Sequence, residues 1–135
     1  MIPTCKHLLP FSLLVALPLL SSCHGDGLNR EQRRVRRAAV RCYECLKAGD
    51  SRSFVKHIAD ADVMPEAYRR EMEALIREYA SNLQLQHGSL TAVSAIGDTI
   101  AGDFAHVYLQ LSFADSTEEQ VGVPMRRVGK EWKMQ

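Results

Sequence analysis

Two kinds of hydrophobic spacing divide the chain into an N-terminal helical part and a C-terminal strand part. Between residues 30 and 87, apolar residues recur at steps of three and four, which places them on one face of a helix. From residue 104 onward, apolar residues alternate with mixed ones, as on a strand with one buried face. This order predicts an α+β domain in which three helices pack on a curved, four-stranded antiparallel sheet.

We expect the three helices over residues 30–48, 51–59 and 65–87. Gly49 ends the first helix, Asp50 can cap the second, and Pro65 suits the first turn of the third. The apolar positions at helical spacing are Val35, Ala38, Ala39, Cys42, Cys45 and Leu46 in the first helix, Phe54, Val55 and Ile58 in the second, and Tyr68, Met72, Leu75, Ile76, Tyr79 and Leu83 in the third.

The strands are expected over residues 90–96, 104–113, 121–125 and 132–134, joined as a meander. The odd-numbered residues of the second strand are apolar and should face the helices. Opposed residues must share a face, so parity favours Leu109 opposite Val123 and Met125 opposite Trp132. This register leaves a loop at 114–118 and a four-residue turn at 127–130.

Length, composition and charge limit the function classes. The 135 residues, 46% hydrophobic and 24% charged, are typical of one folded domain and exclude a disordered chain. A formal net charge of +1 argues against a nucleic-acid-binding protein, which would be strongly basic.

The start of the chain has the pattern of a secretory signal. Lys6 precedes an apolar run at 8–20, which is shorter than the about 20 residues of a membrane-spanning helix. The run ends in Leu20-Ser21-Ser22-Cys23, which resembles a bacterial lipobox. That resemblance implies cleavage between Ser22 and Cys23 and acylation of Cys23, including palmitate-type chains that anchor the protein in a membrane. An ordinary signal peptide with an incidental cysteine, or a short buried helix, is the alternative.

These features divide the chain into three parts. Residues 1–22 form the lipoprotein signal peptide, residues 23–29 a lipidated tether with two glycines, and residues 30–135 the single α+β domain. We expect the domain to lie outside the cytoplasm in the cell envelope, on the periplasmic side or at the cell surface.

Two stretches carry a resemblance to a known family. They are residues 42–50, CYECLKAGD, and residues 123–133, VPMRRVGKEWK. With the element order, they resemble small lipoproteins, common among Bacteroidota, that carry a domain of unknown function with the nuclear transport factor 2-like, or cystatin-like, cone fold. The resemblance covers roughly residues 31–134 and implies a module that binds a small ligand or a protein. Relatives of the fold include isomerases and hydratases, so an enzyme with a cone pocket is one alternative. A structural or immunity-type partner protein of the envelope is the other.

The sequence offers few groups for catalysis. Cys42 and Cys45 form a C-x-x-C pair, but both lie on the apolar stripe within a helix, where small buried hydrophobes are expected; a disulfide and a metal or redox site are the alternatives. A zinc site would need two further ligands. His106 and Tyr108 lie on the mixed strand face, away from the helices, as surface residues or a sheet-to-sheet dimer contact. We therefore expect no catalytic residue, metal or cofactor.

A cone pocket would lie between the helices and the apolar sheet face. The candidate lining residues are Tyr43, Phe54, Tyr79, Leu109, Met125 and Trp132. Asp103 and Glu119, at strand ends, are the acidic residues nearest to this face and would lie at the rim. An isomerase-like enzyme would use one of them with a tyrosine.

Four arginines, Arg30, Arg34, Arg37 and Arg41, form a second stripe on the first helix. They are either a solvated face or a contact with anionic headgroups close to the lipid anchor. The expected partners are therefore the membrane through Cys23, a small apolar ligand or an envelope protein, and a second copy through the sheet, with no nucleic acid.

Overall fold

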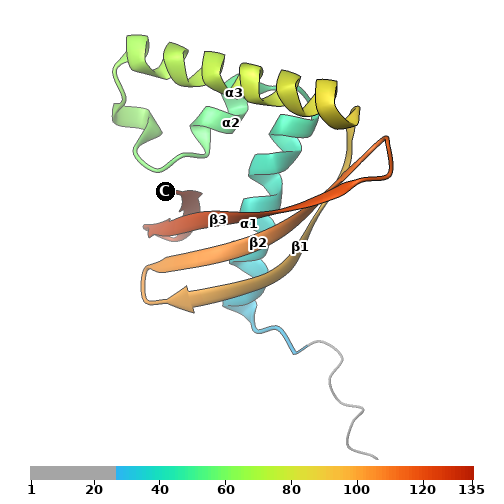
Figure 1. The fold of residues 1–135 in the computed structure, drawn as a ribbon. Coiled ribbons are helices and arrows are strands. Elements are labelled where there is room, and N and C mark those ends of the chain that lie inside the picture. The colour runs from blue at the N-terminus through green and yellow to red at the C-terminus, as the bar shows by residue number, and fades with distance from the viewer. Residues whose placement is uncertain (1–26) are drawn as a thin grey trace, which may run out of the picture.

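A computed structural model describes residues 27–135 and confirms the α+β order of helices followed by a four-stranded sheet (Figure 1). The predicted signal peptide, the lipobox and Cys23 lie outside the described residues. The elements are α1 (Arg30–Lys47), α2 (Ser51–Lys56), the short 3-10 helix η2 (Ala61–Val63), α3 (Glu66–His87), β1 (Leu90–Ala101), β2 (Phe104–Phe113), β3 (Glu118–Val128) and β4 (Glu131–Met134).

α1 is the helix that covers the sheet. A capping box starts it: the Gln32 N–H donates to the Asn29 side chain at 2.8 Å, and the Asn29 N–H donates to Gln32 Oε1 at 3.0 Å. Its buried residues are Val35, Ala38, Ala39, Cys42 and Leu46, all on the predicted apolar face. They form one core with the inward side chains of β2 and β3.

The sheet is a meander in the order β1-β2-β3-β4, with a register that differs from the prediction. Val107 pairs with Val123 and Leu109 with Val121, so the predicted pairing of Leu109 with Val123 is wrong by two residues. The loop between the strands is shorter than expected because Ser116 adopts a left-handed φ of 72°. Since the shift is even, every side chain keeps its predicted face.

The turn between β3 and β4 is also tighter than expected. Met125 pairs with Met134, and Trp132 pairs with Arg127, so the predicted pairing of Met125 with Trp132 is wrong. Gly129, with a φ of 65°, begins a two-residue turn. Glycine tolerates this conformation, so Val128 remains extended without a four-residue loop.

α2 ends at Lys56, three residues before the predicted end. Beyond it the backbone pairs with β4: the Met134 N–H donates to the His57 carbonyl at 2.9 Å, and the Ala59 N–H donates to the Met134 carbonyl. These bonds replace the helical ones and join α2 to the sheet through a parallel bridge between Ile58 and Met134. The predicted strand at 90–96 is longer, because irregular pairing lets β1 continue to Ala101.

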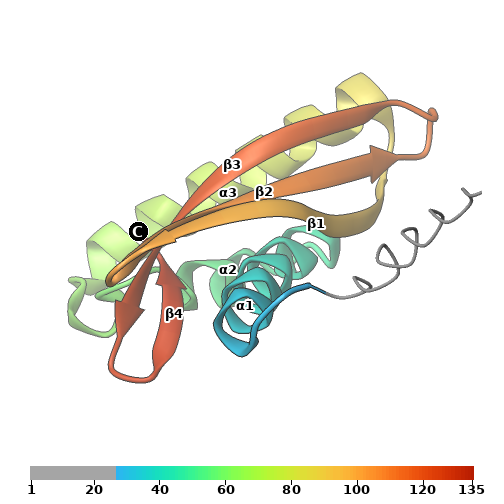
Figure 2. The same cartoon turned by 90° about the horizontal axis from the view of Figure 1, so that it is seen from below.

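α3 lies apart from most of the sheet and packs mainly against α2 (Figures 1 and 2). Leu83 is its only buried residue. Tyr68 is 50% exposed and Leu75 58%, although both belong to the apolar stripe predicted to turn inward. α1 already covers the inward side chains of β2, so the α3 stripe is only partly covered. Within residues 27–135 no helix has both the length and the apolar character to cross a membrane.

The outer face of the sheet carries two aromatic rings set against glycine. Tyr108 pairs with Gly97 on β1 and with Gly122 on β3. A Cβ atom at either glycine would lie 3.6 Å from the Tyr108 ring, and one at Gly122 would lie 2.8 Å from His106 Nε2. The His106 and Tyr108 ring centroids are 5.2 Å apart. The glycines therefore leave room for both rings to lie close to the strands.

Candidate functional site

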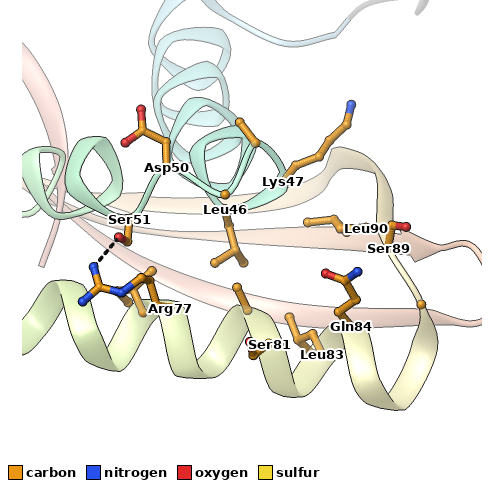
Figure 3. Close-up of a pocket in the computed structure, with 15 residues that line it drawn as sticks. Leu46, Lys47, Asp50, Ser51, Arg77, Ser81, Leu83, Gln84, Ser89 and Leu90 are labelled. Atoms are coloured by element: carbon orange, nitrogen blue, oxygen red, sulfur yellow. Dashed lines mark hydrogen bonds between the residues drawn. The ribbon is translucent and has the colours of Figure 1, made fainter.

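A pocket of about 440 Å³ lies between the end of α1, the start of α2 and the facing side of α3 (Figure 3). Its apolar lining includes Leu46, Ile76, Ala80, Leu83 and Leu90. The volume is within the roughly 300–1,000 Å³ that small-molecule sites occupy, and the lining combines apolar with polar groups as such sites do.

The corner between α1 and α2 creates this pocket. Gly49, with a φ of 74°, lets the chain turn after α1, so α2 starts beside the α1 end instead of continuing it. Arg77 on α3 donates to Ser51 Oγ at 3.3 Å across the pocket (Figure 3). Ser51 is only 8% exposed, so this bond gives a buried hydroxyl a partner.

The carboxylate in the pocket lining is that of Asp50, and it caps α2. It accepts from the Ser53 N–H at 3.1 Å. The hydrogen bonds with Ser53 hold the pKa of Asp50 below its usual value, with smaller effects from Lys56 and Arg52. A carboxylate with a lowered pKa is a weak base, so Asp50 is suited to capping and not to proton abstraction.

The six predicted lining residues lie elsewhere. Leu109 and Met125 are completely buried in the core. Tyr43 packs edge-on against Phe54, with ring centroids 5.7 Å apart, and burial raises the pKa of Tyr43 to about 12. Tyr79 is 37% exposed on α3, and Trp132 lines a smaller cleft beside α1. None of the six lines the pocket, because the α1 core fills the expected cone interior.

The two predicted rim residues are far apart. Asp103 follows β1, where its carbonyl accepts from the Arg127 N–H at 2.8 Å. Glu119 lies near the opposite end of the β2–β3 pair and contacts His87 Nε2 at 3.0 Å. About seven residues of strand, roughly 23 Å, separate these ends, so the two carboxylates do not share a site.

The cysteine pair has the character of packing residues. Cys42 is 1% exposed, and its Sγ donates to the Ala38 carbonyl at 3.3 Å. Burial, followed by the nearby Cys45, raises the pKa of Cys42 to about 12. Burial also raises the pKa of Cys45, which is half-buried, and both thiols are free. A high thiol pKa disfavours the thiolate that redox and metal chemistry need.

The structure also contains two clusters of polar side chains that were not predicted from the sequence. Asp98 on β1 has a side chain 2% exposed and pairs with Arg36 Nε, while Gln32 Nε2 donates to it at 3.3 Å. His87, at the end of α3, contacts Glu119 as above, Asp115 at 3.6 Å and Thr117 Oγ1 at 3.1 Å. Asp98 lies beyond the strand predicted at 90–96, so no predicted element gave its side chain a direction.

Both clusters connect elements. Asp98 ties β1 to α1, and His87 ties α3 to the β2–β3 loop while its ring lies 4.9 Å from that of Phe113. Among residues 27–135 no group of three or more histidine, cysteine or acidic side chains could hold a metal ion.

Comparison with known proteins identifies a fold. No family model matches the chain, and no curated protein matches it. A solved structure from Campylobacter jejuni, named a "putative NTF2-like transpeptidase", superposes with a TM-score of 0.60 at 15% identity, covering 73% of this chain and 94% of that one. A second solved structure, RPA3114, is a SEC-C motif containing protein from Rhodopseudomonas palustris. Its likeness is weaker, with a TM-score of 0.43 at 11% identity over 68% of this chain and 67% of that one. The first likeness shows that the chain has a nuclear transport factor 2-like fold.

Proposed function

We propose that this protein is a lipid-anchored module of the cell envelope, on the extracytoplasmic side of a membrane, which binds a small apolar ligand without catalysis. The pocket between α1, α2 and α3 carries this proposal, because apolar side chains form much of its lining and its carboxylate already caps a helix. The anchor rests on the sequence 20–23, Leu-Ser-Ser-Cys, after an apolar run.

Acylation is tested in cells by incorporation of labelled fatty acid. Cys23→Ala should abolish the label, while Cys5→Ala, which also removes a cysteine near the start of the chain, should leave it unchanged. Unchanged labelling of the Cys23 variant would remove the anchor from the proposal.

Ligand binding is tested with the fluorescent apolar anion 1-anilinonaphthalene-8-sulfonate. Ala80→Phe places a ring in the pocket and should remove most of the bound probe. Ala74→Phe adds the same ring to an exposed position of α3 and is the matched control. Equal binding by both variants would show that the probe sits elsewhere, and would count against the pocket as the site.

An isomerase-like or hydratase-like enzyme is the second candidate, favoured by the contact of Glu119 with His87. Burial, followed by the charge of Glu119, raises the pKa of Tyr79, so the carboxylate of this pair acts electrostatically on a tyrosine. The reaction in the printed name of the structural neighbour, transpeptidation, would need a nucleophile, and the raised thiol pKa values of Cys42 and Cys45 do not favour these two as one. Turnover of a small carbonyl compound that is lost in Glu119→Gln would favour the enzyme.

A protein-interaction module is the third candidate. Phe104 is 52% exposed, Ile96 45% and Tyr108 42%, and the two aromatic residues lie on the outer face of the sheet. Such a surface fits an envelope protein or a second copy of this chain. Tyr108→Glu should then lower the mass seen by sedimentation without changing the circular dichroism spectrum; an unchanged mass would exclude a dimer through this face.

A further inference from the structure

One side of the molecule gathers cationic side chains from two separate elements. We call it the basic face; its members are Arg30, Arg34, Arg37 and Arg41 on α1 and Lys130 in the β3–β4 turn. α1 and β4 lie side by side (Figure 2). The Arg34 guanidinium donates to the Lys130 carbonyl at 2.7 Å, so the turn is held against the helix. This hydrogen bond fixes the position of the turn, and of Lys130 within it, relative to the arginines of α1.

Most of these cations have no acidic partner in the described part of the chain. Arg36, on another side of α1, pairs with Asp98, and Arg34 has Glu31 at 4.0 Å. Arg37 and Arg41 make no ion pair or side-chain hydrogen bond within residues 27–135. They stand four residues apart on one helix, where like charges repel. Their charge is thus left available to an anion from outside.

The charge is concentrated here although the chain is nearly balanced. The formal net charge of the whole sequence is only +1. The basic face nevertheless places five cations beside three carboxylates, Glu31, Glu44 and Glu131. An uneven distribution of this kind orients a protein in an electric field, such as that above an anionic surface.

A small cleft in the basic face suits a phosphate group. Its volume is about 150 Å³, and its lining includes four cations, Arg34, Arg37, Arg41 and Lys130, beside Trp132 and one carboxylate, Glu131. This volume is well below the size of sites for drug-sized ligands. Guanidinium groups bind phosphate oxygens with paired, charge-assisted hydrogen bonds. One headgroup phosphate is therefore a better occupant than a larger molecule.

The expected lipid anchor would bring this face to a membrane. Six residues separate Cys23 from Arg30, so the two residues are at most about 25 Å apart when the chain is extended. We infer that the basic face docks on the phosphate groups of anionic lipids in the membrane that holds the anchor, which leaves the pocket beneath α3 open to solvent. This inference rests on the proposed lipid anchor and adds the orientation of the anchored domain.

The test uses the acylated protein in vesicles and its single tryptophan as the reporter. Trp132 lies in the lining of the cleft, so energy transfer from Trp132 to a dansyl-labelled lipid measures how close the basic face is to the membrane. We expect more transfer in vesicles containing phosphatidylglycerol than in vesicles of phosphatidylcholine alone. High salt should remove the difference, because salt screens exposed charges.

The decisive variant is Arg37→Glu with Arg41→Glu, which reverses two exposed charges that have no partner to lose. The control is Arg52→Glu with Arg70→Glu, which makes the same charge change on α2 and α3. It also loses the ion pair of Arg70 with Glu66, but both side chains are more than 70% exposed, and such surface pairs contribute little to stability. Each removed cation should weaken the preference for anionic lipid by roughly five-fold. The control should retain the transfer of the unaltered protein.

Flotation of the same samples separates the two proposals. Protein that floats with both vesicle types, but shows equal transfer in both, overturns the docking inference and leaves the anchor standing. Protein that floats only with anionic vesicles, and loses this in the Arg37 and Arg41 variant, supports docking and overturns the anchor. Protein that floats with neither overturns both.

Discussion

The α1–β2 region and the α3 region contain similar apolar spacing but very different packing. The inward side chains of β2 are at most 9% exposed, and the apolar face of α1 is equally closed. In α3 the stripe has one buried member, Leu83, while Leu75 is more than half exposed. Spacing identifies the face that can be buried, but burial also requires a partner surface that is still free.

The same difference places the stable core and the candidate ligand pocket in separate regions of the molecule. The α1–β2 core is closely packed, whereas the pocket lies beside α3, which buries few of its side chains. Elements with few buried contacts open at lower free energy than the core, and ligand sites are often built on them. Changes in the two regions should therefore have effects of different size.

The largest contrast is expected between two leucine truncations. Leu109→Ala removes a completely buried side chain from β2 and should lower the free energy of unfolding by about 3 kcal/mol. Leu75→Ala on α3 should change it by less than about 0.5 kcal/mol. Urea unfolding of both variants measures the difference, and similar losses would show that α3 belongs to the same cooperative core.

A smaller contrast is expected between neighbouring arginines of α1. Arg36→Ala leaves the buried Asp98 carboxylate without its main partner and should cost about 2 kcal/mol. Arg37→Ala, one residue further on the exposed side, should stay within about 0.5 kcal/mol. The same unfolding measurement applies, and equal effects would mean that Asp98 is not the group that fixes β1 to α1.

The smallest effect concerns His57, at the junction of α2 with β4. Burial, followed by the charges of Lys133 and Arg41, lowers the pKa of His57 below 6.5. As the pH falls, His57 is therefore protonated in the unfolded chain before it is protonated in the folded protein, and this favours unfolding. The stability that neutral His57 contributes is lost between about pH 6.5 and its folded-state pKa, and the free energy of unfolding has no further dependence on His57 below that pKa.

In His57→Gln this part of the pH dependence should disappear when unfolding is compared at about pH 7 and pH 5.5. Asp50 and Asp115 have lowered pKa values, so their contributions are lost only at lower pH, as it falls below 3.8. An identical slope in the variant and the parent protein would mean that another group titrates in this range.

Much of the fold could be predicted because its signals are local. The period of three to four in α1, the period of two in β2 and the glycine at 49 each act within a few residues. The register could be predicted only to within two residues, because parity fixes the face but the turn conformations of Ser116 and Gly129 fix the alignment.

The site was less predictable because its position depends on which helix packs against the sheet. Leu109 and Met125 are apolar residues of the kind that line a pocket, but α1 packs on them and they form part of the core. The pocket instead uses the helix ends around Ser51, and no spacing pattern marks such a corner. The partner of Asp98 could not be predicted either, because 62 residues separate it from Arg36.

The two glycines on the outer face differ in the space beside them: a Cβ at Gly97 would make an ordinary contact of 3.6 Å with the Tyr108 ring, whereas one at Gly122 would meet His106. Gly122 is exposed, yet a single methyl group there would lie 2.8 Å from His106 Nε2 and displace that ring. Solvent exposure is thus a poor guide to mutational freedom at this position. Because the atom in the way lies at the end of the His106 side chain, a substitution at residue 122 would move this ring and with it the contact between His106 and Tyr108.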